Sequence, residues 1–282
     1  MSNIIKGLNT AIVLHENHFL ALAMKIKNAA DEESLFFFQL PQLHDLLLVL
    51  QSQLQRLSIA AVQNGKALTA AVSEAHQNLI AQVPPIDVSE ITAPAPGKRV
   101  ASLAMKPNAD QNTLHLILQN ERVISLAIMD IQAEFVIRAI IQALNNIKER
   151  ELIAYLTERL DFLPLYDVDL SNTDSMDYNQ YPQEPWKQNL FAHHLALLYC
   201  CKTANGEQII CGAVVKTNVQ EGTPAAEDIA FRLQKISPHI KKYQGQVTHI
   251  FSRQIPAQQG AVLTLEQALK PLHTFYLEKI AE

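Results

Sequence analysis

Apolar and polar positions follow one another along the chain in a pattern that predicts strands and helices in a recurring order. Two segments show the short apolar runs of strands and precede a segment with helical spacing, and the same succession occurs about 90 residues later. The predicted elements lie at residues 19–27, 34–40, 41–57, 113–119, 122–129 and 131–147. Each unit has the order strand, strand, helix. Either a duplication or two independent cases of a common arrangement would produce this pattern.

A third hairpin is predicted in the last third of the chain. Residues 190–202 and 207–217 flank Asn205-Gly206, a pair typical of a two-residue type I′ turn, and such a turn places Cys200 opposite Cys211. Both faces of this hairpin are apolar, so we expect it to be central in its sheet and covered on both sides. The chain then continues with a helix from Pro224, a strand at 246–255 and a final helix that begins with a capping box at Thr264 and Gln267.

Two irregular stretches divide the predicted elements. Residues 82–112 contain five prolines among small and polar residues, which predicts a proline-rich linker. Residues 163–187 combine prolines with acidic residues, and we predict an acidic connecting loop there. The sequence therefore predicts an α+β fold in which hairpin-plus-helix units pack as antiparallel sheets against helices, in two domains at 1–162 and 188–282.

Composition and charge limit the classes of protein to which the chain can belong. The 282 residues include 23 basic and 28 acidic side chains, a net charge of -5 that creates no general field for nucleic acid. We expect no nucleic-acid partner, although Lys235, Lys241 and Lys242 lie near one helix end. The chain has no apolar run of membrane-spanning length and no secretory leader pattern, and its three cysteines, an odd number, fit a reducing compartment. These features predict a cytoplasmic protein without membrane contact.

Several familiar motifs are absent from the sequence. No two of the eight glycines lie closer than six positions apart, which excludes the GxGxxG dinucleotide motif and the GxSxG nucleophile elbow. The chain also has no P-loop, no HExxH and no CxxC motif. We therefore expect no bound cofactor and favour a role without catalysis.

The segment at residues 161–177 carries the most concentrated chemistry. Its sequence DVDLSNTD resembles the start of a calcium-binding loop, but Asn172 stands where that loop requires glycine and Tyr178 where it requires glutamate. A solvated acidic linker and an oxygen-ligand metal site are the two open interpretations. The metal-site hypothesis names Asp167, Asp169 and Asp174.

The cysteines invite a redox interpretation. In the predicted register Cys200 and Cys211 form a hydrogen-bonded strand pair, in which side chains are too far apart for an unstrained disulfide. We expect buried thiols without a chemical role.

Two predicted helices are more apolar than one buried face requires. A helix packed on a sheet buries a stripe slightly wider than 100°, whereas Leu47, Leu48 and Leu50 spread over about 300° because each residue advances about 100°. Burial within one domain and self-association both explain this excess. We predict a homodimer, with an interface formed by Leu47, Leu48, Val49, Ile137 and Ile141.

Five segments of the chain resemble the YjeJ family of enterobacterial proteins. They are IKGLNT (5–10), ESLFFF (33–38), LLLVLQSQL (46–54), LDFLPLYDVDL (160–170) and LKPLHTFYLE (269–278). The resemblance implies a bacterial cytosolic protein of the kind often encoded in mobile or prophage-like regions. It implies no activity and no catalytic residues.

These observations favour one function and leave an alternative. We predict a non-catalytic accessory or regulatory protein that acts through contacts with an unidentified protein partner, in the setting of a mobile element or a phage response. The alternative is a metal-dependent hydrolase or nuclease that uses the carboxylates of residues 161–177 to hold a divalent ion.

Overall fold

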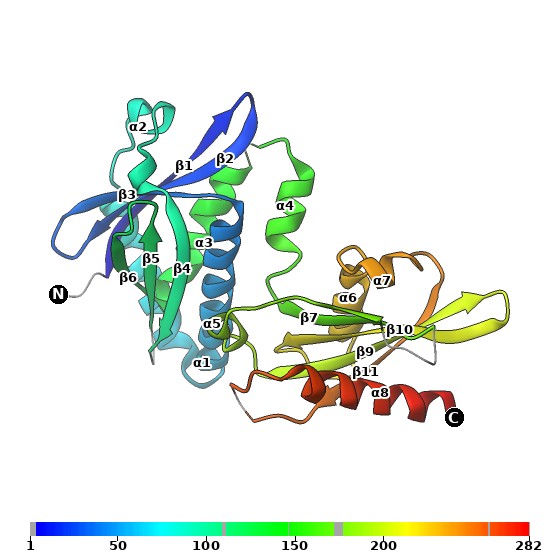
Figure 1. The fold of residues 1–282 in the computed structure, drawn as a ribbon. Coiled ribbons are helices and arrows are strands. Elements are labelled where there is room, and N and C mark those ends of the chain that lie inside the picture. The colour runs from blue at the N-terminus through cyan, green and yellow to red at the C-terminus, as the bar shows by residue number, and fades with distance from the viewer. Residues whose placement is uncertain (1–3, 109–110, 146, 172–176, 259, 282) are drawn as a thin grey trace. The chain divides into compact units, whose positions relative to one another are not determined.

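The fold is α+β, as predicted, with helices packed on antiparallel sheets (Figure 1). The computed structural model describes residues 4–108, 111–145, 147–171, 177–258 and 260–281. The chain divides into two compact units, Met1–Leu160 and Asp161–Glu282. Each unit is described separately below.

The N-terminal unit contains two three-stranded sheets, each followed by a helix. The first group is β1 (Ile5–His15), β2 (His18–Asn28), β3 (Glu33–Phe38) and α1 (Leu40–Ala81). The second group is β4 (Val100–Pro107), β5 (Gln111–Leu118), β6 (Val123–Met129) and α3 (Asp130–Leu144). The short helices α2 (Val88–Thr92) and η1 (Pro96–Lys98) join the groups, and α4 (Arg150–Thr157) follows them.

The two groups are repeats of one structural unit, with three strands before the helix instead of the predicted two. Asp31 and Glu121, 90 residues apart, occupy the same place in the turn between the second and third strands, with φ angles of 62° and 64°. In each turn the last residue of the second strand donates its N–H to the carbonyl four residues later, at 3.0 Å and 2.9 Å. The strand registers match as well, since Leu22 pairs with Phe38 as Asn112 pairs with Ile128. The recurring pattern in the sequence therefore corresponds to a structural repeat.

The two repeats hold each other through reciprocal contacts. Ile4 forms an isolated bridge with Ala127, and Arg99 forms one with Phe37, so each first strand begins beside the last strand of the other repeat. The third residue of each helix donates to the first strand of the other repeat, at 3.0 Å and 2.9 Å. These bonds run from Gln42 Nε2 to the Ala101 carbonyl and from Gln132 Nε2 to the Ile5 carbonyl.

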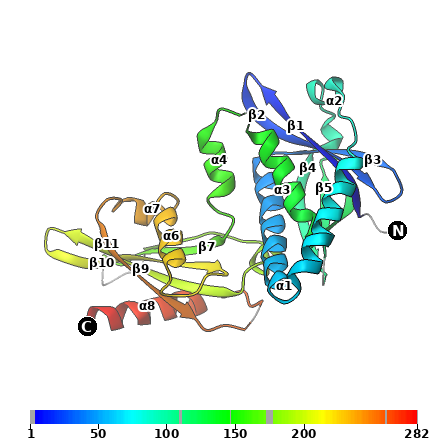
Figure 2. The ribbon, with the colours of Figure 1, turned by 180° about the vertical axis from the view of Figure 1, so that it is seen from behind.

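The first part of helix α1 is enclosed by its own unit, which corrects the reason for expecting a partner there. Leu47, Leu48 and Val49 are buried because α3, α4 and the strands β1 and β4 contact the helix from several sides. On α3, Ile137 is half-buried and Ile141 is 44% exposed. Helix α1 has 42 residues, and Figure 2 shows its ribbon turning sharply near the middle. In the described residues no helix is long and apolar enough to cross a membrane.

The proline-rich stretch is only partly a linker. Residues 82–112 include the strand β4 (Val100–Pro107). The sequence did not predict this strand because of the prolines around it. Pro107 is tolerated because β4 is an edge strand of its sheet, where a missing N–H donor removes no bond to a second neighbour.

The C-terminal unit is a five-stranded antiparallel sheet with helices on both faces. Its strands are β7 (Phe162–Asp169), β8 (Asp177–Gln180), β9 (His193–Thr203), β10 (Gly206–Thr217) and β11 (Val247–Ile255), in the order β11-β9-β10-β7-β8. Its helices are α5 (Pro185–Gln188), α6 (Pro224–Leu233), α7 (Pro238–Lys241) and α8 (Leu265–Ala281). One apolar cluster joins the sheet to α6 and α7, and a second joins its other face to α8. The β9–β10 hairpin is therefore central and covered on both faces, as predicted.

The predicted cap of the last helix is also confirmed. The Gln267 N–H donates to Thr264 Oγ1 at 3.3 Å, and the Thr264 N–H donates to Gln267 Oε1 at 3.0 Å. This reciprocal pair satisfies two backbone donors at the helix start.

Residues 163–187 do not form the predicted connecting loop. Most of the first half of this segment is β7, which pairs with β10 on one side and β8 on the other. The prediction was wrong because Pro164 resists a regular ladder, whereas in the structure Pro164 pairs with Val215 beside a register shift. The segment belongs to the C-terminal unit.

The predicted register of the β9–β10 hairpin was also wrong. The turn consists of Ala204 and Asn205 and not of the predicted Asn205-Gly206, since Thr203 pairs with Gly206. A bulge at Ile210 then interrupts the ladder, and the two differences together place Cys211 opposite Tyr199 and not opposite Cys200. A shift of one residue moves a side chain to the other face of a sheet, and Cys211 consequently shares its face with Cys201.

Two glycines test the packing of the N-terminal unit. A Cβ atom on Gly7 would lie 1.8 Å from the Gln82 carbonyl oxygen, whereas one on Gly65, inside α1, meets nothing within 4 Å. We expect Gly7→Ala to lower the free energy of unfolding by about 1–3 kcal/mol through overpacking. The control Gly65→Ala should raise it by about 0.5–1 kcal/mol because alanine favours the helix. Urea unfolding followed by far-ultraviolet circular dichroism measures both, and equal stability of the two variants would refute the packing.

Candidate functional site

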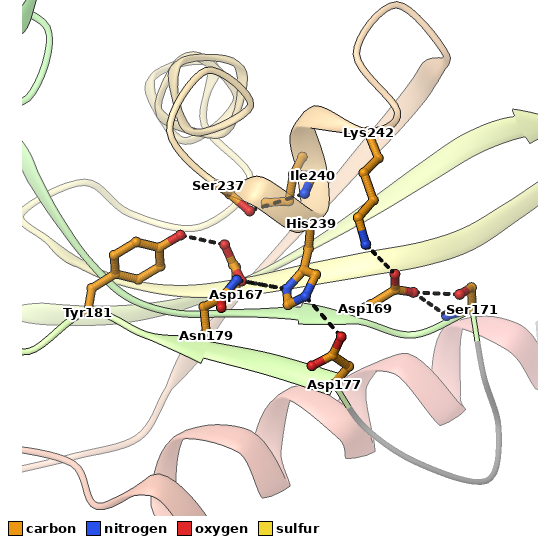
Figure 3. Close-up of polar contacts among 10 residues, drawn as sticks. All are labelled: Asp167, Asp169, Ser171, Asp177, Asn179, Tyr181, Ser237, His239, Ile240 and Lys242. Atoms are coloured by element: carbon orange, nitrogen blue, oxygen red, sulfur yellow. Dashed lines mark hydrogen bonds and ion pairs between the residues drawn. The ribbon is translucent and has the colours of Figure 1, made fainter.

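The candidate site is built around Asp167, a carboxylate with no exposed surface in the middle of β7. Its oxygens accept hydrogen bonds from Tyr181 Oη at 2.5 Å, Asn179 Nδ2 at 2.9 Å and His239 Nδ1 at 2.7 Å (Figure 3). The Ser237 side chain also hydrogen-bonds to it. A buried charge is tolerated only when its hydrogen-bonding capacity is filled in this way.

Three elements bring these donors together. Strand β8 pairs with β7 so that Asn179 lies opposite Asp167, and Tyr181 follows one residue after β8 ends. Helix α7 contacts β7 and supplies His239. The local sequence starts this helix at a defined residue, because Ser237 accepts the Ile240 N–H at 3.1 Å as its N-cap and proline occupies the next position.

The surroundings of Asp167 keep it ionised. Burial alone raises the pKa of its carboxyl, but the hydrogen bonds from Ser237, Tyr181, Asn179 and His239 outweigh burial and hold that pKa below its ordinary value. An ionised carboxylate can only accept hydrogen bonds, so Nδ1 of His239 must carry a proton and donate it.

The other ring nitrogen of His239, Nε2, faces an exposed carboxylate. Nε2 lies 3.3 Å from Asp177 Oδ2, and the Asp177 side chain is 76% exposed. The ring itself is buried, so Nε2 is the ring atom that faces a group at the surface. A histidine oriented through Nδ1 by a buried carboxylate is an arrangement suited to general acid–base catalysis.

Asp169 forms a separate polar group on the same strand. Its carboxylate accepts the N–H and the hydroxyl of Ser171 at 3.0 Å and 2.5 Å, and Lys242 Nζ lies 3.4 Å away. Burial raises the pKa of Asp169, but the bonds from Ser171 and Lys242 bring it below its ordinary value.

The metal-site hypothesis receives no direct support from this geometry. Asp167 and Asp169 use their oxygens for protein donors, and Asp174 lies outside the described residues. Among the residues that the structure describes, no three His, Cys, Asp or Glu side chains are arranged to hold a metal ion. The hypothesis stays a prediction.

Comparison with known proteins places the chain in a family. The model of the YjeJ-like family matches residues 1–282. The chain belongs to the YjeJ-like family. It is similar to a protein of Escherichia coli (strain K12) titled "Uncharacterized protein YjeJ", with 39% identity over 276 residues that cover 95% of this chain and 93% of the relative. No solved structure matches.

Sequence reasoning found one part of this site in the YjeJ-like chain and missed the rest. It singled out Asp167 and Asp169 but not His239, which lies 72 residues further along. The Ser237-Pro238 pair is a recognisable helix start, and it was the only local signal near the histidine. Nothing in the sequence links that helix to β7.

The lowered pKa values predict how stability depends on pH. A carboxyl whose pKa is depressed by folding stabilises the protein above its unfolded value of 3.8, and this contribution is lost as the pH falls through the lower folded value. We expect Asp167→Asn to lower the free energy of unfolding at pH 7 by about 1–3 kcal/mol, because its amide cannot accept all four donors. Between pH 5 and about pH 2–3, the free energy of unfolding should also fall less in this variant than in the wild type, because the variant has no carboxyl to protonate at this position.

Fluorescence of Trp186, the chain's single tryptophan, follows the unfolding of this unit in urea. Glu227→Gln is the control, because Glu227 is exposed on α6 in the same unit. It should keep the pH dependence of the wild type, and an identical acid slope for Asp167→Asn would contradict the assignment of the ionised carboxylate.

Proposed function

We propose that the C-terminal unit catalyses a hydrolytic reaction in which His239 transfers the proton. The observation that supports this proposal most is the 2.7 Å hydrogen bond between Asp167 and Nδ1 of His239, with Nε2 directed to an exposed carboxylate. This arrangement fixes the orientation of the ring and the nitrogen that bears the proton.

Each residue has a defined role in the proposed chemistry. Nε2 of His239 takes a proton from an attacking water or hydroxyl and returns it to the leaving group. Asp167 orients the ring and stabilises the positive charge that develops on it, while Tyr181 and Asn179 hold Asp167 in place. Asp177 lies at Nε2, at the position where a substrate approaches.

The proposal retains the hydrolase alternative drawn from the sequence but changes the role of its carboxylates. In place of metal ligation, Asp167 acts through the histidine, since its oxygens already accept protein donors. No step in the proposal passes through a metal ion.

Hydrolysis of general substrates tests this function. We expect the wild type to cleave at least one p-nitrophenyl phosphomonoester, phosphodiester or carboxylic ester, and His239→Ala to lower kcat by about 10²–10⁴-fold, the usual contribution of a general acid–base group. Asp167→Asn should also lower kcat. The matched control is His249→Ala on β11, whose side chain is 64% exposed and lies in the same unit.

Trp186 fluorescence confirms that each variant is folded before the assay. Equal rates for the wild type and His239→Ala would contradict the proposal, as would the failure of the wild type to cleave any substrate in the set.

A second candidate function is the association of two copies of the chain through the N-terminal unit. It is one specific form of the accessory role predicted from the sequence. Its supporting observation is the exposure of Ile59 (69%) and Val62 (88%) on α1. These residues are three positions apart and therefore lie on one face of the helix. The pair replaces Leu47, Leu48 and Val49 as the proposed contact, since the chain itself covers those three.

Light scattering at micromolar concentration tests the association. We expect a mass near twice 31.5 kDa for the wild type and near 31.5 kDa for Val62→Lys, because a buried charge disrupts an apolar interface. Val88→Lys is the control, since Val88 is 72% exposed on α2. A wild-type mass that stays at 31.5 kDa as the concentration rises would rule out the dimer.

A further inference from the structure

The bulge in β10 places two thiols together on one face of the C-terminal sheet. Cys201 on β9 and Cys211 on β10 both lie in the apolar cluster under α6 and α7, and neither has exposed surface. Cys211 lies opposite Tyr199, so Cys201, two residues further along β9, is its diagonal neighbour on that face. Cys200 belongs to the opposite face, because successive residues of a strand alternate.

The two thiols differ in reactivity. The pKa of Cys201 is lowered, chiefly because the Cys211 S–H donates to its sulfur, although burial opposes this effect. The pKa of Cys211 is raised by the same bond, by burial and by the negative charges of Asp169 and Asp167. Cys201 is therefore the sulfur that becomes a thiolate, and Cys211 is the one that keeps its proton.

The pair lies directly below an exposed end of the sheet. Residues 204–205, which turn the chain from β9 to β10, and the first three residues of β10 are exposed, and Cys201 is three positions before this turn. Local opening of a hairpin end costs less than global unfolding, and it admits a small oxidant without unfolding the sheet.

We propose that Cys201 and Cys211 form a peroxide-oxidisable dithiol site, in which Cys201 is the attacking sulfur and Cys211 resolves the product as a disulfide. This site is independent of the proposed hydrolytic function.

The reaction balances with hydrogen peroxide as the oxidant. The Cys201 thiolate attacks one peroxide oxygen, an S–O bond forms, the O–O bond breaks and hydroxide leaves, so that Cys201 becomes a sulfenic acid. The Cys211 sulfur then attacks the Cys201 sulfur and loses its proton, an S–S bond forms, the S–O bond breaks and water leaves. Two thiols and one peroxide thus give one disulfide and two waters.

Peptide mapping of the oxidised native chain tests the site. The reduced protein is treated with hydrogen peroxide, the peroxide is removed with catalase, and the remaining thiols are alkylated in denaturant. We expect two of the three thiols to be lost, with Cys201 linked to Cys211 and Cys200 alkylated. The control Cys200→Ser should give the same disulfide. A disulfide that contains Cys200, a link between chains, or the recovery of all three thiols would overturn the proposal.

Trapping with dimedone, which labels sulfenic acids, tests the assigned roles. In Cys211→Ser the resolving sulfur is absent, so we expect Cys201 to accumulate the dimedone adduct. In Cys201→Ser the attacking sulfur is absent, and we expect at least a tenfold lower adduct yield at Cys211. Equal labelling of the two variants would contradict the division of roles between the sulfurs. Labelling of Cys200 in either variant would show that unfolding exposes the thiols, and would contradict a native site.

Discussion

The need to compensate a charge that has no exposed surface organises the C-terminal unit around Asp167. A carboxylate removed from water is destabilising unless donors replace the lost solvation. Four side chains do so here, and they come from β8, the residue after it, α7 and the N-cap of α7. The same bonds that compensate the charge also determine where β8 and α7 lie against β7. Orientation of the His239 ring is therefore a consequence of keeping Asp167 ionised.

For the C-terminal unit, the sequence predicted where strands and helices lie better than it predicted the register in which the strands pair. Alternation and turn residues located both strands of the β9–β10 hairpin and its central place in the sheet, because these depend on local pattern and on apolar character. The bulge at Ile210 depends on how β10 fits between two neighbours, so the local pattern carries no sign of it. The turn also lies one residue earlier than the Asn205-Gly206 pair indicated, and the two differences together gave Cys211 a partner other than the predicted Cys200. His239 was missed for the same reason, since only the tertiary fold brings it to Asp167.

The excess of leucine in α1 illustrates a different limit of sequence analysis. Five consecutive buried residues, 46–50, exceed what one sheet covers, and a second copy of the chain was one reasonable explanation. The repeat supplies the cover internally, because α1 packs on α3 while strands of both repeats approach it. The recurring order of strands and helix was visible in the sequence. The reciprocal packing was not, since it depends on contacts between residues that are 59 to 127 positions apart.

The two repeats also differ at two positions where the second repeat buries polar side chains. Asn112 and Asp130 occupy the places that Leu22 and Leu40 hold in the first repeat, yet Asn112 is fully buried and Asp130 nearly so. Arg56 on α1 compensates Asp130 and the oxygen of Asn112. Its guanidinium binds both oxygens of Asp130, at 2.8 Å and 2.5 Å, and donates to Asn112 Oδ1 at 3.1 Å. A bidentate pair of this kind offsets the desolvation that an isolated Asp130 would suffer. Arg56 lies beyond the part of α1 that corresponds to α3, so the longer first helix is what permits the polar substitutions in the second repeat.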